Sequence, residues 1–384
     1  MRKTNLVLST LLIFTVLLAA CAPKATPAPA EPQATEAAAQ PAESAYMDEL
    51  IKAAKAEGAL TTIALPHDWC NYGEMIETFK SKYGIEVNEL NPDGSSADEV
   101  EAIKANKGNK GPQAPDVVDV GLAFGPQMVQ EGLTLPYKVQ TWDTIPAELK
   151  DADGNWWLDF YGVMAMEVNK DAVDNVPQDF SDLLKPEYKG KVALSGDPRA
   201  SAQAQNAILA AALANGGSLE NVEPGLAFFK QLNDAGNFVP VAGKQMTVAK
   251  GETPVLLRWD YNALADKAIL EDNPTVEVVI PKSVVLAGPY IQAISAYAPH
   301  PNAAKLWQEF LYSDEGQLIW LKGYCHPARF ADMVSRGVIP ADIEAMLPAP
   351  EIYEKAIFPT IEQINAAKEY IAKNWDTMVG ADVK

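Results

Sequence analysis

Apolar residues recur at two spacings along the chain, and these spacings predict alternating helices and strands. Apolar positions three and four residues apart over 46–56 and 75–83 are typical of helices that bury one face. Short apolar runs typical of buried strands lie beside these segments, at 60–65, 85–90 and 115–120. Together with a polar helix over 97–107, this order and its short connections predict right-handed crossovers and a parallel sheet covered on both faces.

The second half of the chain continues the alternation with longer helices. Strands are predicted at 163–168, 191–194, 253–259 and 276–280. Helices are predicted at 202–214, 224–235, 261–270, 302–312 and 315–323, and the tail from about residue 340 is also predicted to be helical. In open α/β sheets ligands bind beyond the carboxyl ends of the strands, which points to the loops 66–73 and 121–126.

The first residues have the pattern of an export signal. Two cations precede an apolar stretch over 6–18, which is too short to span a bilayer because a span takes about 20 residues. The Leu-Ala-Ala-Cys21 that follows resembles the lipobox of bacterial lipoproteins. This implies a signal peptide over 1–20, acylation of Cys21 and an extracytoplasmic place on the membrane, in the periplasm or at the cell surface. A plain secreted protein with a cysteine here is the alternative. Residues 21–45 are rich in Ala and Pro and predict a disordered tether.

Composition narrows the class of partner. The net charge of −20 at pH 7 argues against nucleic acid and against adsorption on anionic lipid. No G-x-S-x-G elbow, P-loop or H-E-x-x-H motif occurs in the sequence, and it holds three histidines. A binding protein without catalytic residues, cofactor or metal is therefore expected, and a tethered extracellular hydrolase is the alternative from another class.

Two cysteines remain once Cys21 is acylated, namely Cys70 and Cys325. An even pair in an oxidising compartment favours a disulfide. Each cysteine also lies near a histidine, His67 and His326, so two free thiols or a zinc or copper site stay open as alternatives.

Several segments resemble, in order, the ABC-importer solute-binding proteins of the type II periplasmic-binding fold, in the branch that binds ferric iron, polyamines, thiamine and 2-aminoethylphosphonate. They are AEGALTTI at 56–63, FKSKYGIEV at 79–87, PDVV at 115–118, KPEYKGKV at 185–192, DPRAS at 197–201, and AAKLWQEFL with SDEGQ at 303–317.

The resemblance implies two α/β lobes, each a mainly parallel sheet flanked by helices, with hinge strands between them. Lobe 1 is expected over 46–162, lobe 2 over 163–282, and a return to lobe 1 with C-terminal helices over 283–384. It also implies a monomer that takes up a small solute by hinge closure and passes it to the transmembrane subunits of an ABC permease.

The loop that resembles the family's D-P-x-x-S motif predicts an anion site. It follows a strand and opens a helix, so its N–H groups and the helix dipole favour negative charge. Ser201 would donate its hydroxyl and Arg199 would clamp a carboxylate or phosphonate. The family often continues Ser-Gly-Thr here, whereas this chain has Ala202-Gln203.

The end of the strand at 253–259 predicts a site for an ammonium group. The family's ferric binders place neighbouring tyrosines near this point, but this chain has Trp259-Asp260, which disfavours iron. An indole face beside a carboxylate suits an amine. We therefore expect an amine-bearing, zwitterionic solute such as an aminophosphonate, with a polyamine or a metal complex as alternatives. Further cleft candidates are Asp68, Trp69, Phe124, Tyr161 and Tyr290.

Overall fold

The computed structural model describes residues 41–384, of which 45–384 form one compact unit. The predicted signal peptide, Cys21 and residues 21–40 of the predicted tether lie outside the described residues. The first helix, α1 (Pro41–Glu57), begins inside the segment that was expected to be a disordered tether. In the part of the chain that is described, no helix combines the length and the hydrophobicity that crossing a membrane requires.

The first lobe begins with the predicted alternation of strands and helices. Its first strands are β1 (Ala59–Ile63), β2 (Glu86–Leu90) and β3 (Val117–Gly121), of which β1 and β2 pair in parallel. Its helices are α2 (Tyr72–Tyr83), α3 (Ser96–Ala105), α4 (Phe124–Gln130), α9 (Pro301–Leu311) and α10 (Asp314–Lys322). Gly84 ends α2 at a φ of 65°, where its N–H donates to the carbonyl of Lys80.

The second lobe also alternates strands with helices. Its strands are β5 (Val192–Leu194), β6 (Phe238–Ala242), β7 (Val255–Trp259) and β8 (Val276–Val279). Its helices are α5 (Ala202–Ala214), α6 (Glu223–Asp234), α7 (Gln245–Ala249) and α8 (Asp260–Leu270). β5 pairs in parallel with both β6 and β7. Short 3-10 helices lie in connections, at 142–144, 147–149, 170–172, 180–184 and 186–188.

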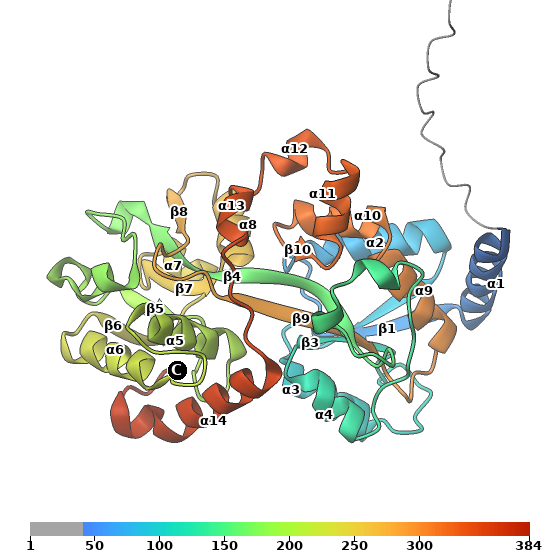
Figure 1. The fold of residues 1–384 in the computed structure, drawn as a ribbon, viewed down its shortest axis with the longest axis horizontal. Coiled ribbons are helices and arrows are strands. Elements are labelled where there is room, and N and C mark those ends of the chain that lie inside the picture. The colour runs from blue at the N-terminus through green and yellow to red at the C-terminus, as the bar shows by residue number, and fades with distance from the viewer. Residues whose placement is uncertain (1–40) are drawn as a thin grey trace, which may run out of the picture. The chain divides into compact units, whose positions relative to one another are not determined.

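Two long strands connect the lobes. β4 (Trp157–Asn169) pairs with β9 (Ala287–Ile294) and β10 (His326–Pro327) through its first half and with β7 and β8 through its second half. β9 also pairs with β3, so one mixed sheet with the strand order β3-β9-β4-β7-β5-β6 extends through both lobes. Figure 1 shows β4 and β9 side by side across the middle of the molecule. These crossing strands pair antiparallel, so the parallel pairing expected from sequence is limited to β1–β2 and β5–β6–β7.

The C-terminal segment crosses the hinge and ends on the second lobe. After α11 (Phe330–Arg336), α12 (Ala341–Glu344) and α13 (Pro350–Tyr353), the N–H of Ile357 donates to the carbonyl of Val285 beside β9. α14 (Ile361–Met378) then packs against α5 and α6 (Figure 1), and Lys384 pairs with the edge of β6. The last helix therefore belongs with the second lobe and not with the first.

Candidate ligand-binding cleft

A cavity lies where the two lobes meet beside the crossing strands. It measures about 710 Å³ including its open mouth. The first lobe contributes residues 121–124 after β3, and β9 contributes 288–290. The second lobe contributes residues between 200 and 209 at the start of α5, Trp259 at the end of β7, and three residues of α14. The cavity thus lies beyond the carboxyl ends of β3 and β7, as expected of an α/β sheet.

The start of α5 brings amide groups to the cavity. Ser201 is the N-cap of this helix, because its hydroxyl accepts the N–H of Ala204 at 3.3 Å. One turn into the helix, Gln205 is 7% exposed, and its amide nitrogen has no hydrogen-bond partner among the described residues. A buried unpartnered donor that lines a cavity is suited to a ligand oxygen.

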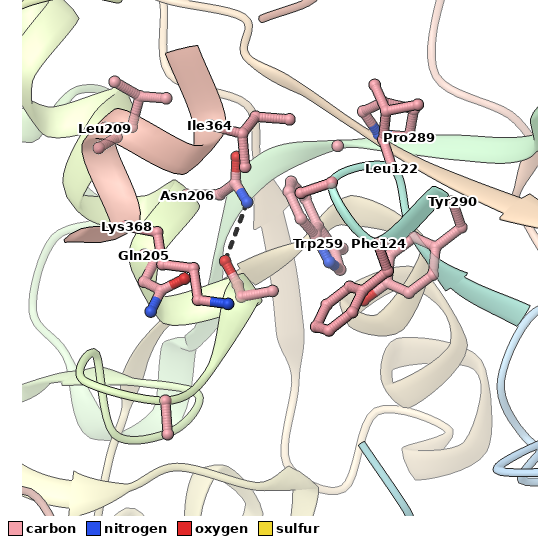
Figure 2. Close-up of a pocket in the computed structure, with 16 residues that line it drawn as sticks. Leu122, Phe124, Gln205, Asn206, Leu209, Trp259, Pro289, Tyr290, Ile364 and Lys368 are labelled. Carbon is pink, nitrogen blue, oxygen red and sulfur yellow. Dashed lines mark hydrogen bonds between the residues drawn. The ribbon is translucent and has the colours of Figure 1, made fainter. Parts of the chain in front are cut away.

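Lys368 of α14 adds a positive charge to the same side of the cavity. Its ammonium lies 5.1 Å from the centre of the Phe124 ring, and it forms no ion pair within residues 41–384. Figure 2 shows Lys368, Gln205 and Asn206 on one side of the cavity. The side chain of Asn206 donates to the carbonyl of Ala202 at 2.9 Å, so part of its capacity is used within the helix.

Aromatic side chains form the opposite side of the cavity. Trp259, Phe124 and Tyr290 lie together there (Figure 2). Trp259 is 1% exposed and lies directly on the backbone of β9 at Gly288. A Cβ at Gly288 would lie 2.0 Å from the indole, so only glycine permits this packing. Of the residues predicted from sequence, these three aromatic residues are the ones that line the cavity, and their contact with a ligand stays a prediction.

Arg199 does not face the cavity, contrary to the expectation from sequence. Its guanidinium pairs with Asp197 at 2.9 Å, with Asp376 of α14 at 3.0 Å and with Asp382 near the C-terminus at 2.9 Å. Three carboxylates neutralise this cation, so it attaches the C-terminal segment to the second lobe and is not free to clamp an anion. Ser201 is likewise used as a helix cap and is not among the lining residues.

Asp260 is also taken up by the protein itself. One carboxylate oxygen accepts the N–H of Val163 at 2.8 Å and the other accepts the hydroxyl of Tyr353 at 2.5 Å. Complete burial raises the pKa of Asp260 to about 6, against the opposing effect of these hydrogen bonds. Asp260 therefore joins the hinge to α13, and the predicted ammonium site beside Trp259 lacks its carboxylate.

This arrangement predicts that Asp260→Asn affects stability and leaves affinity largely unchanged. The oxygen of Asn can still accept the N–H of Val163, and its amide nitrogen can donate to the hydroxyl of Tyr353. Hydrogen bonds to a carboxylate are thereby replaced by bonds between neutral groups, which should cost about 1 kcal/mol. Urea unfolding of the variant measures this loss. A more than tenfold loss of ligand affinity with unchanged stability would return Asp260 to the ligand site.

The remaining sequence candidates, Asp68, Trp69 and Tyr161, do not line this cavity. Trp69 packs edge-on against Tyr261 at 5.5 Å and Tyr290 at 5.8 Å, and so connects the loop 66–73 with the second lobe. Asp68 is exposed. Tyr161 packs against Phe358 at 5.0 Å and lines a separate, mostly apolar hollow.

Cys70 and Cys325 form a disulfide with their Cα atoms 5.5 Å apart. It connects the loop 66–73 with the segment after α10. The alternatives of free thiols and of a metal site that uses both cysteines are thereby excluded in this structure. Among residues 41–384, no group of three or more His, Cys, Asp or Glu side chains is arranged to hold a metal ion.

Three residues that line the cavity, Gln205, Asn206 and Lys368, were not predicted from the sequence. Gln205 and Asn206 lie in an alanine-rich helix, and its mostly apolar composition predicts a buried helix without ligand contacts. Their position about one turn after Ser201 could have indicated that they lie near the predicted anion site. Lys368 is one of two lysines in α14, and only the packing of this helix over the cleft distinguishes it.

Comparisons with known proteins agree on the fold. The family model described as bacterial extracellular solute-binding protein matches residues 113–345, while no curated protein matches the chain. The structure of the periplasmic binding protein AfuA from Actinobacillus pleuropneumoniae, with fructose-6-phosphate bound, has a TM-score of 0.64 at 21% identity over 84% of this chain and 98% of AfuA.

Two further solved structures are similar to this chain. Iron-bound HitA from Pseudomonas aeruginosa has a TM-score of 0.61 at 19% identity, over 84% of this chain and 99% of HitA. The spermidine/putrescine-binding PotD from Streptococcus pneumoniae has a TM-score of 0.57 at 15% identity, over 82% of this chain and 99% of PotD. These similarities confirm the predicted two-lobed fold, and their ligands differ from one structure to the next.

Proposed function

Because this chain belongs to the family of bacterial extracellular solute-binding proteins, we propose that it captures a small anionic solute for an ABC importer. In this proposal Cys21 carries the lipid anchor, and residues 22–40 form the tether between the membrane and the binding lobes. The two lobes close around the solute by bending at β4 and β9. The protein acts as a monomer and passes the solute to the permease without chemical change.

The hydrogen-bond donors on one side of the cavity are the observation that supports an anionic ligand. The unpaired ammonium of Lys368 and the unpartnered amide of Gln205 meet at the start of α5, where the helix dipole also favours negative charge. No acidic residue is among the described residues that line the cavity. A carboxylate, phosphonate or phosphate therefore matches the site better than a polyamine or a ferric ion.

The aminophosphonate expected from sequence agrees with this proposal through its phosphonate group, which is anionic. Its amine would have to rely on the aromatic faces of Trp259, Tyr290 and Phe124, since Asp260 is engaged elsewhere. Such a contact is worth about 0.5–2 kcal/mol. The anionic group is thus expected to contribute more to binding than the amine.

Replacing Lys368 with alanine should weaken the binding of the best anion by about 1.5–3 kcal/mol, the scale of a hydrogen bond to a charged group. A thermal-shift screen of phosphate, phosphonates, carboxylates, spermidine and ferric citrate identifies that anion, and calorimetry of both proteins measures the difference.

The matched control is Lys373→Ala, because Lys373 lies on the same helix and is exposed. This variant should bind as the unchanged protein does. Stabilisation by spermidine alone, or by ferric citrate but not by any iron-free anion including citrate, would contradict the anionic ligand, as would equal affinity in the Lys368 and Lys373 variants.

A further inference from the structure

The lining has few polar side chains, namely the hydroxyl of Tyr290 on the aromatic side and a group of donors on the side of α5 and α14 (Figure 2). Lys368 and Gln205 can donate to a ligand there, whereas the amide of Asn206 is partly used within α5. Two donors and a helix start can satisfy one anionic group. They cannot also satisfy several hydroxyls distributed over a ligand.

Apart from the hydroxyl of Tyr290, the rest of the lining is apolar. It consists of Leu122, Phe124, Leu209, Trp259, Pro289 and Ile364 together with small residues. The indole N–H of Trp259 also has a protein partner when the amide of Gln203 turns its oxygen toward the ring, at 3.2 Å. A hydroxyl or amine of the ligand held against this surface away from the hydroxyl of Tyr290 would lose its water without gaining a partner, which is unfavourable.

The aromatic wall is held in a defined position, which suits a flat ligand. Trp259 lies on β9 because Gly288 has no side chain, and Tyr290 stacks on Phe160 with an interplanar angle of 15°. The opposite wall is formed by α5 and α14, including Leu209 and Ile364 (Figure 2). Aromatic rings prefer offset-stacked or edge-on contact with another ring, and aliphatic side chains pack on its other face.

From these observations we infer that the solute is an organic anion with a single charged group and a flat, apolar body, such as an aromatic or unsaturated acid. The charged group lies between Lys368 and Gln205, and the body lies against Trp259, Phe124 and Tyr290. This inference rests on the proposed function and narrows its ligand from anions in general to one chemical class. It differs from the zwitterion expected from sequence and from a polyhydroxylated phosphate.

Calorimetry on the full chain in detergent tests the inference with two series of probes that share a charged group. The first comprises phenylphosphonate, methylphosphonate and 2-aminoethylphosphonate, and the second comprises benzoate, acetate and β-alanine. In at least one series, the aromatic member should bind at least tenfold more tightly than both others. Equal affinities within both series, or the tightest binding by an amine-bearing member, would overturn the inference.

Two variants separate this inference from the proposed function. Phe124→Ala should reduce the advantage of the aromatic probe over methylphosphonate or acetate several-fold, with Phe124→Leu intermediate. Lys368→Ala should weaken all members of a series by a similar factor. If anions bind and Lys368→Ala weakens their binding as expected, but the aromatic member has no higher affinity than the others, only the inference is rejected. Failure of every anion to bind rejects the proposed function as well.

Discussion

Replacing Cys70 and Cys325 together with serine should lower the free energy of unfolding by about 2–5 kcal/mol. The disulfide joins residues 255 positions apart, so its loss frees a very long loop in the unfolded chain. Both cysteines are almost completely buried, at 1% and 0% exposure. Two buried serine hydroxyls would add the penalty of polar groups placed in an apolar site. Urea unfolding of the double variant beside the unchanged protein measures the difference.

The disulfide also holds the loop that carries Trp69. Cys70 and Asn71 have φ values of 46° and 62°, in the left-handed region that non-glycine residues rarely adopt. Without the bond this loop should relax, and Trp69 should lose its packing against Tyr261 and Tyr290. A double Cys70→Ala, Cys325→Ala variant controls for the buried hydroxyls. Unfolding midpoints equal to that of the unchanged protein in both variants would show that the disulfide does not stabilise the fold.

The second large effect is expected on stability as the pH rises, because three carboxyls are buried together in the first lobe. Glu99, Asp119 and Asp159 are at most 6% exposed. Burial raises the pKa of Asp119 to about 7, and burial together with the charge of Asp119 raises the pKa values of Glu99 and Asp159.

The groups that donate hydrogen bonds to these acids are neutral. Tyr72 donates its hydroxyl to Asp119 at 2.7 Å, and the amide of Gln292 donates to Asp159 at 2.9 Å. Glu99 accepts the N–H of Asp119 at 2.9 Å. Asp98 adds a further negative charge near Glu99, and the charges of Asp119 and Asp159 raise the pKa values of the nearby phenols Tyr261, Tyr290 and Tyr312. No cation compensates the cluster among these neighbours, so protonation is the available way to remove its charge.

The sign of the pH dependence follows from the raised pKa values. The folded chain binds more protons than the unfolded chain between the unfolded pKa of about 4 and the folded pKa of about 7 for Asp119. The free energy of unfolding should therefore fall as the pH rises through this interval. At pH 8 Asp119→Asn, which imitates the protonated acid, should be more stable than the unchanged protein by on the order of 2–4 kcal/mol, since one pKa unit corresponds to about 1.4 kcal/mol.

At pH 4 the same variant should be about as stable as the unchanged protein, because Asp119 is then already protonated. Urea unfolding at both pH values measures the difference, and Asp153→Asn, at an exposed position, is the control that should alter neither. A variant that is less stable at pH 8 than the unchanged protein would show that Asp119 is bound as a carboxylate.

The elements with strong periodicity could be predicted from sequence, whereas the second crossing strand could not. The predicted helices at 202–214, 224–235 and 302–312 agree with α5, α6 and α9 to within about a residue. β9 was missed because Gly288 and Pro289 interrupt an otherwise apolar run and read as a turn. In the structure Gly288 is required by the indole of Trp259, a contact between residues far apart in sequence.

The candidate site was predicted in its location and only partly in its residues. The loops after two strands and the aromatic residues Phe124, Trp259 and Tyr290 were identified because strand ends and residue types can be read locally. Arg199 and Asp260 were assigned to the ligand because a charged side chain beside a strand end has the same appearance in sequence whether it faces a cleft or a neighbouring element. Their partners, Asp376, Asp382 and Tyr353, lie more than 90 residues away.

The sequence by itself determined the alternation of helices and strands and the family resemblance, because these depend on local periodicity and on residue type. It favoured a bond between Cys70 and Cys325, which the tertiary structure then showed. The tertiary structure alone decided which charges remain free. Arg199 pairs with an acid of the C-terminal segment, and Asp260 accepts a hydrogen bond from a tyrosine of that segment. Lys368 of the same segment lies at the cleft without an ion-pair partner among the described residues. The physical reason is that a charge is available to a ligand only when folding leaves it without a partner, and partners are set by contacts between residues far apart in the chain.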